Sequence, residues 1–130
     1  MRSTFPKETI ASFVTVKFNV PKKASSVNCE VPKNNGNQKI DYNQSSHSVE
    51  WQIQKMPGDV EYEGIAKITL PSATSSQAQK EIGPVSLSFE IPMFCISGMQ
   101  IKSLKTIQGN GDFNKWVRYI TKSSSYVCRI

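Results

Sequence analysis

The sequence predicts an antiparallel all-β fold of the β-sandwich type, and three observations lead to this prediction. Apolar and polar residues alternate with a period of two along much of the chain, which is typical of strands with one buried face. Proline or glycine ends nearly every alternating run, so the runs are short and separated by turns. No stretch keeps the i, i+3, i+4, i+7 spacing of an amphipathic helix.

The first expected strand covers residues 13–20, where apolar side chains alternate with mostly polar ones. Pro21 ends it, because proline cannot donate a hydrogen bond to a β-ladder. A second alternating run covers residues 27–31 and also ends at a proline. The polar residues 33–38 then predict a turn, since Asn and Gly tolerate positive φ angles.

The remaining expected elements follow the same logic. Alternating runs predict strands at 49–53, 62–70 and 85–91, and residues 99–105 alternate as well. Two last strands are expected at 116–120 and 126–130. The intervening segments predict a turn at 56–59, a small-polar loop at 72–80 and a glycine-containing turn at 109–112.

The length and the net charge of the chain limit the functions that it can have. The chain has 130 residues, enough for one domain or part of one, and a net charge of +6. Residues 95–130 hold six basic residues against Asp112 alone, so this quarter of the chain carries +5. Such a basic surface predicts an anionic partner, namely nucleic acid, an acidic protein or a phospholipid headgroup.

Composition also bears on the compartment and on cofactors. No apolar run approaches the length of a membrane span, and the first residues lack an apolar signal core. The three cysteines are widely spaced and match neither a disulfide framework nor a Cys-x-x-Cys metal site. We therefore expect a reduced, cytoplasmic environment and no cofactor or metal.

The sequence contains little that resembles a catalytic site. The single histidine, His47, lies in a polar loop without a carboxylate or cysteine beside it in the sequence. Glu61 and Glu63 share a predicted strand face with Lys67, which favours a solvated surface over an acid/base pair. We do not expect an enzyme.

Binding is better supported, by the segment Lys115–Tyr119. It combines two cations, an indole and a phenol, and a strand would direct Trp116 and Arg118 to one face. An arginine beside an aromatic ring can stack on a ligand, and an edge strand can pair with an extended peptide. The alternative, in which Trp116 anchors the core and Arg118 is an ordinary surface charge, is equally open at this point.

Several spaced motifs resemble a known family, the medium (mu) subunits of adaptor protein complexes. The resemblance covers essentially the whole chain, and residues 80–86 and 126–130 look most like the mu subunit of the fourth complex. The clathrin-linked first and second complexes stay open alternatives. The matching pieces are Arg2-Ser3-x-Phe5, Val16-x-Phe18-x-Val20-Pro21, Glu50-Trp51 with residues 55–58, residues 89–94, residues 97–101, and residues 116–121 with Tyr126 and Arg129.

The resemblance implies a mu homology domain made of two β-sandwich subdomains, one inserted into the other. Residues 1–93 match the inserted subdomain. Residues 94–130 match the closing strands of the first subdomain, whose other half is absent here. We expect these closing strands to expose apolar faces that become disordered, swap between protomers or pair in a non-native oligomer.

The family's activity implies a cargo-recognition role in vesicle-mediated transport, by binding Tyr-x-x-Φ sorting signals (Φ bulky and apolar) in the cytosolic tails of membrane proteins. Ile101 and Leu104 lie on opposite faces by simple alternation, so a shared pocket needs a twist or bulge. The family's tyrosine-binding aspartate falls outside this sequence, so we expect this chain alone to bind cargo weakly or not at all. By motif match, Trp116 and Arg118 form the tyrosine pocket, and Ile101, Leu104, Lys115 and Val117 form the Φ pocket and peptide strand.

The implied partners are other adaptor-complex subunits, Tyr-x-x-Φ tails and an acidic or phosphoinositide membrane surface contacted by Lys102, Lys105 and Lys122. The implied location is peripheral, on Golgi, trans-Golgi network, endosomal or plasma-membrane coated vesicles. The alternative functions are a membrane-surface module and a basic nucleic-acid-binding β domain. The second is the weaker, because only the strand around Trp116 interleaves aromatic and basic residues, so no nucleic acid partner is expected.

Overall fold

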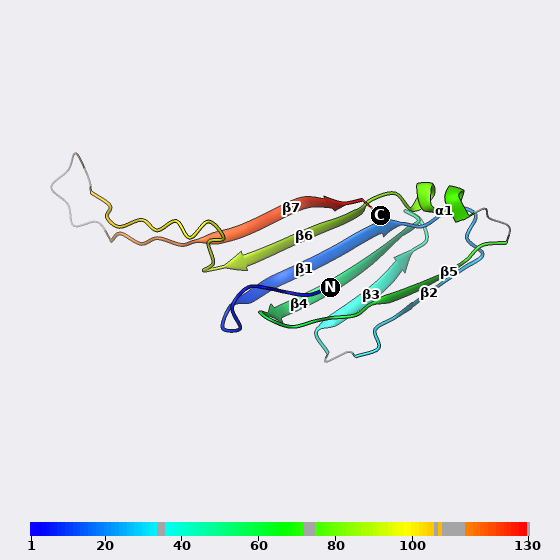
Figure 1. Cartoon of the computed structure of the whole chain (residues 1–130), viewed down its shortest axis with the longest axis horizontal. Helices are drawn as coiled ribbons and strands as arrows, with labels where there is room; N and C mark the ends of the chain where they lie inside the picture. Colours follow the sequence, from blue (N-terminus) through cyan, green and yellow to red (C-terminus); the bar gives the residue numbers. More distant parts are fainter. Residues whose placement is uncertain (34–35, 72–74, 106, 108–113, 130) are drawn as a thin grey trace.

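The computed structural model describes residues 1–33, 36–71, 75–105, 107 and 114–129. The chain is built almost wholly from antiparallel strands, which confirms the predicted fold class (Figure 1). One sheet has five strands in the order β3-β4-β1-β6-β7, and β2 pairs with β5 in a separate ribbon. The elements are β1 (Ile10–Asn19), β2 (Ser26–Glu30), β3 (Gln38–Asn43), β4 (Ser48–Pro57), β5 (Ile65–Thr69), α1 (Ser75–Ile82), β6 (Val85–Pro92) and β7 (Ile120–Cys128).

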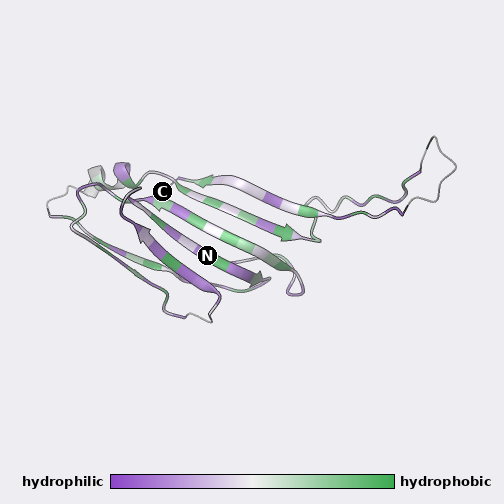
Figure 2. Cartoon of the chain, turned by 180° about the vertical axis from the view of Figure 1, so that it is seen from behind, coloured by the Kyte–Doolittle hydropathy of each residue, from purple (hydrophilic) through white to green (hydrophobic). Residues whose placement is uncertain are grey.

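Strand β1 lies at the centre of the sheet, between β4 and β6. Two residues of β1 that the alternation places on one face lie on the core side of the sheet: Val14 is buried, and Val16 packs against the same core. Figure 2 shows polar and apolar residues alternating along the strands from the other side of the chain. The sheet therefore has one face that builds the core and one that meets solvent.

The alternation changes phase once, near the start of β1. Ala11 and Val14 are both buried with two exposed residues between them, and their partners Met56 and Ile53 repeat this spacing on β4. Lys55 lies between Ile53 and Met56 and has a φ of 49°. A single residue in the left-handed region turns the backbone enough to return the next side chain to the buried face.

The core is formed by one face of the sheet and the N-terminal segment that lies across it (Figure 1). Phe5 from that segment packs against the core, and its ring lies 6.2 Å from the ring of Phe94. Burying a side chain of the size of Ile53 contributes about 1.5–3 kcal/mol, so this face supplies much of the stability. The buried apolar residues of the cluster are Ala11, Val14, Trp51, Ile53, Met56 and Ile91.

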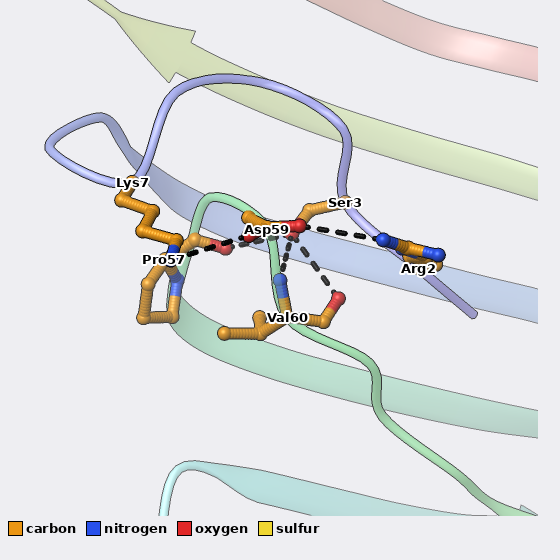
Figure 3. Close-up of polar contacts among 6 residues, drawn as sticks. All are labelled: Arg2, Ser3, Lys7, Pro57, Asp59 and Val60. Atoms are coloured by element: carbon orange, nitrogen blue, oxygen red, sulfur yellow. Dashed lines mark hydrogen bonds and ion pairs between the residues drawn. The ribbon is translucent and has the colours of Figure 1, made fainter.

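Ser3 of the N-terminal segment forms hydrogen bonds with the turn after β4 (Figure 3). Its hydroxyl lies 2.8 Å from the carbonyl oxygen of Pro57 and 3.2 Å from that of Val60, and it accepts a hydrogen bond from Val60 N–H at 3.0 Å. Gly58 is buried in this turn, directly beneath the backbone of Phe5. The turn has no room for a side chain at that position.

Charged side chains close over the same turn. Asp59 lies 3.4 Å from the guanidinium of Arg2 and 3.5 Å from the ammonium of Lys7 (Figure 3). All three side chains are largely exposed, so these pairs contribute little energy and serve mainly to orient the segment.

Two elements differ from the prediction. Helix α1 occupies most of the segment expected to be a polar loop, because its Ala, Gln, Lys and Glu residues are good helix formers even without an apolar stripe. Gly83 follows its last residue, Ile82, and has a φ of 64° that suits a C-terminal cap. Strand β3 was not predicted, because its first residue, Gln38, is polar yet buried and obscures the alternation.

The C-terminal strands differ as well. The structure has one strand, β7, where two were expected at 116–120 and 126–130, and residues 114–119 precede it outside any strand. The serine run at 123–125 does not break the strand, because the β6–β7 register shifts by one residue between Leu87 and Phe89 and absorbs the extra serine in a bulge. The predicted turn at 109–112 and Ile130 lie outside the described residues.

The chain leaves the sheet after Pro92 and returns at Ile120. The first of these points coincides with the boundary expected between the two subdomains. Strand β7 then pairs with β6 in the same sheet. The assignment of residues 94–130 to a second subdomain stays a prediction.

Candidate functional site

The candidate site lies on a projecting segment formed by residues 93–105, 107 and 114–119, which we call the arm. The arm extends away from the sheet between β6 and β7, with an outgoing and a returning limb (Figure 1). Its base is closed by two hydrogen bonds, from Met93 N–H to the carbonyl oxygen of Tyr119 at 2.7 Å and from the Thr121 hydroxyl to the carbonyl oxygen of Phe94 at 2.7 Å.

Tyr119 joins the two limbs farther out. Its hydroxyl accepts a hydrogen bond from Ile101 N–H at 2.8 Å. The bond brings Ile101, on the outgoing limb, beside the residues that directly precede β7. This role of Tyr119 was not predicted, because nothing in the local sequence identifies the partner of a phenol so far away in the chain.

Trp116 and Arg118, the predicted tyrosine pocket, are both exposed on the returning limb. Trp116 is 77% exposed, so it does not anchor the core of this chain, and that alternative is wrong here. Residues 115–118 also lie outside the strands, so the expected edge strand at this place is not formed. Both side chains are free to contact a ligand.

The predicted Φ pocket and peptide strand are divided between the limbs. Ile101 and Leu104 lie on the outgoing limb, each 48% exposed. Lys115 is exposed and Val117 half-buried on the returning limb. The structure thus brings all six predicted cargo residues onto one arm, with the Ile101–Tyr119 hydrogen bond linking its two limbs.

The arm combines positive charge with uncovered apolar surface. Its described part has four cations and no acidic residue, which leaves the local potential positive. Lys102 and Lys105 are exposed there, whereas Lys122 lies in β7 with its ammonium 3.7 Å from Glu90. The exposed large apolar residues of the arm are Met93, Ile96, Met99, Ile101, Leu104, Ile107 and Trp116.

The arm contains one cysteine, Cys95. Its sulfur lies 3.2 Å from the Ser97 hydroxyl, and this hydrogen bond, helped by nearby backbone N–H groups, lowers the pKa of Cys95. By contrast, burial raises the pKa of Cys29 in β2, and the charge of Asp41 adds to that effect.

The residues considered for catalysis do not assemble. His47 lies in the β3–β4 turn with its Nδ1 3.3 Å from the Tyr42 hydroxyl. Glu61 and Glu63 precede β5 rather than sharing a strand face with Lys67, and Lys67 instead lies 3.3 Å from Glu30. Among the described residues, no group of three His, Cys, Asp or Glu side chains could hold a metal, and no helix is long and apolar enough to cross a membrane.

Comparison with known proteins gives consistent results. The sequence profile of the adaptor complexes medium subunit family matches residues 1–130. The chain is 35% identical to the AP-4 complex subunit mu of Arabidopsis thaliana over 132 residues, covering all of this chain and 29% of that protein. It is 35% identical to the AP-4 complex subunit mu of Dictyostelium discoideum, covering 28% of it.

A relative from another complex aligns over nearly the same length. The AP-1 complex subunit mu-2 of Bos taurus is 33% identical over 129 residues, which is 98% of this chain and 29% of that protein. The chain therefore spans less than a third of the length of each of these relatives.

Proposed function

Because the chain belongs to the adaptor complexes medium subunit family, we propose that it forms part of the cargo-recognition surface of a vesicle-coat adaptor subunit. The ligand is the Tyr-x-x-Φ sorting signal of a membrane protein's cytosolic tail, and the partners are the other subunits of the complex. The protein acts by binding, without catalysis, and works on the cytoplasmic face of coated vesicles. The greater similarity to AP-4 subunits favours the trans-Golgi network.

The observation that carries this proposal is the exposure of Trp116 beside Arg118 on the arm. An indole flank and a guanidinium face suit a phenol ring, which stacks on planar cations and aromatic edges. Ile101 and Leu104 supply nearby apolar surface for the Φ side chain. An extended peptide would hydrogen-bond to the backbone of residues 115–118, which lies outside the strands.

The chain carries only part of this pocket, so binding requires the rest of a mu subunit. The test is a fluorescence titration with a labelled Tyr-x-x-Φ peptide. It compares the 130-residue chain with a chimera in which this chain replaces the matching stretch of the Arabidopsis thaliana relative. We expect the chimera to bind and the chain alone to bind weakly or not at all.

Arg118→Ala should weaken peptide binding by the chimera about tenfold or more, because the cation–aromatic contact is lost. Arg129→Ala removes the same charge from an exposed residue that follows β7 and should leave binding nearly unchanged. Equal losses in the two variants would point to general electrostatic attraction and would contradict the assigned tyrosine pocket.

A second function, contact with an anionic membrane surface, is favoured by the absence of acidic residues from the described part of the arm. Lys102 and Lys105 would face the lipid, with Lys122 contributing less because of its ion pair with Glu90. Co-sedimentation with vesicles that contain phosphoinositide, against neutral vesicles, tests this function. Binding that persists in Lys102→Ala/Lys105→Ala would contradict it.

A further inference from the structure

Tyr119 contacts the outgoing limb of the arm at two places that lie far apart in the sequence. Its carbonyl oxygen accepts a hydrogen bond from Met93 N–H at 2.7 Å, and its hydroxyl accepts one from Ile101 N–H at 2.8 Å. An extended chain from Met93 to Ile101 would cover about 26 Å, far more than the two oxygens of one tyrosine are apart. The outgoing limb therefore folds back between these contacts, and Tyr119 fixes which parts of the two limbs lie level with each other.

The fold-back occurs in a turn over residues 95–98. Gly98 N–H donates a hydrogen bond to the carbonyl oxygen of Cys95 at 3.0 Å, and the φ of Gly98 is 67°. The Ser97 hydroxyl lies 3.2 Å from the sulfur of Cys95 in the same turn. None of these contacts uses the hydroxyl of Tyr119. Removing that hydroxyl should therefore release the limb beyond the turn, while the bond between Met93 and the Tyr119 carbonyl keeps the base of the arm closed.

Side-chain exposure alternates along the returning limb. Trp116 and Arg118 are exposed. Val117 and Tyr119 are half-buried, so they point to the other side of the limb. The Tyr119 hydroxyl meets Ile101 on that second side. An extended peptide directs residues i and i+3 to opposite sides, and the tyrosine and Φ of a Tyr-x-x-Φ signal are three residues apart. When the signal's tyrosine lies on the side of Trp116 and Arg118, its Φ residue therefore points to the side on which Ile101 is held.

We propose that Tyr119 is a positioning residue for the Φ side chain of the signal, an inference that rests on the function proposed above. Its hydroxyl holds Ile101 beside the returning limb, and Leu104 follows three residues farther out on the same limb. Both apolar side chains are 48% exposed and so offer surface to a ligand. Tyr119 needs no contact with the cargo for this role. Loss of its hydroxyl should weaken the recognition of Φ and leave the recognition of the signal's tyrosine unchanged.

Hydrogen exchange of the Ile101 amide, followed by NMR in the 130-residue chain, tests the link between the limbs without any cargo. We expect this amide to exchange about fivefold faster in Tyr119→Phe than in the unmodified chain, because its hydrogen-bond acceptor is lost. Tyr126→Phe is the matched control, since it removes a hydroxyl from an exposed residue of β7, and it should leave the rate unchanged. Equal exchange rates in the unmodified chain and in Tyr119→Phe would overturn the proposal.

Titration of the chimera tests the role in recognition, with a Tyr-x-x-Φ peptide and two versions in which either Φ or the tyrosine is replaced by alanine. In Tyr119→Phe, the loss of affinity caused by replacing Φ should shrink about fivefold, whereas the loss caused by replacing the tyrosine should stay the same. Tyr126→Phe should change neither loss.

An unchanged effect of replacing Φ in Tyr119→Phe would overturn the positioning role. Equal shrinkage of both losses would also overturn it, because that result indicates a general disturbance of the site. Failure of the unmodified chimera to bind any of the peptides would instead contradict the proposed function, and the positioning role with it, even where the exchange experiment shows that Tyr119 joins the limbs.

Discussion

Replacing Gly58 with alanine should destabilise the fold strongly. A Cβ atom at this position would lie 2.1 Å from the carbonyl oxygen of Pro6 and 2.2 Å from that of Phe5. Both are backbone atoms, so the clash cannot be relieved by a side-chain rotation. The N-terminal segment must lift away from the turn after β4.

The size of this loss of stability follows from the contacts that the movement breaks. The hydroxyl of Ser3 loses its hydrogen bonds to the carbonyl of Pro57 and to Val60, each with a net value of about 1 kcal/mol. Overpacking of a close contact costs a further 1–3 kcal/mol or so. We therefore expect Gly58→Ala to lower the free energy of unfolding by about 3–5 kcal/mol.

Equilibrium denaturation with urea, followed by the fluorescence of the buried Trp51, measures this difference. Gly36→Ala is the control, because Gly36 has a φ of 83° and no atom within 4 Å of an added Cβ. It should cost only the conformational strain, about 1 kcal/mol. If Gly58→Ala were no more destabilising than Gly36→Ala, the account of how the N-terminal segment is held would be wrong.

The other predictions concern backbone strain and thiol reactivity. Lys55→Gly should raise the free energy of unfolding by up to about 1 kcal/mol in urea denaturation, because glycine adopts the 49° φ of this exposed position without strain; a loss of stability would contradict this account of the phase change. Cys95, whose pKa is lowered, holds more thiolate at neutral pH than Cys29, whose pKa is raised, so iodoacetamide should modify Cys95 first and begin to do so at lower pH. Ser97→Ala should slow that reaction; mass spectrometry that finds the rate unchanged would contradict the assigned hydrogen bond.

The strands that build the core could be predicted because each buries one face. Val14 and Val16 follow the period of two that a half-buried strand imposes, and the structure keeps their predicted face. The phase change at Lys55 could not be predicted, because lysine has no preference for positive φ and only the packing of Met56 into the core requires it.

The unpredicted elements are those whose stability comes from distant parts of the chain. Gln38 is buried because its side chain reaches the carbonyl oxygen of Lys33 at 2.9 Å, and β3 forms because β4 offers a free edge. Helix α1 is short and lacks an apolar stripe, so the periodicity that identifies longer helices is missing.

For the candidate site, the motif resemblance predicts six cargo-binding residues, which the structure places on the two limbs of the arm; their role in cargo binding stays a prediction. Sequence patterns could not predict how the arm is held, because the bond between Ile101 and Tyr119 depends on two limbs meeting in space. They also could not decide between a buried and an exposed Trp116. That choice depends on whether another layer covers the arm, and in this chain Trp116 is 77% exposed.

The most direct test of the central claim is the titration of the chimera with peptides that differ in one residue. The cargo-recognition account predicts saturable binding of the Tyr-x-x-Φ peptide that is lost when its tyrosine is replaced by alanine. It also predicts that Trp116→Ala abolishes the difference between the two peptides. Equal binding of both peptides by the unmodified chimera, or tyrosine-dependent binding that survives Trp116→Ala, would contradict the claim.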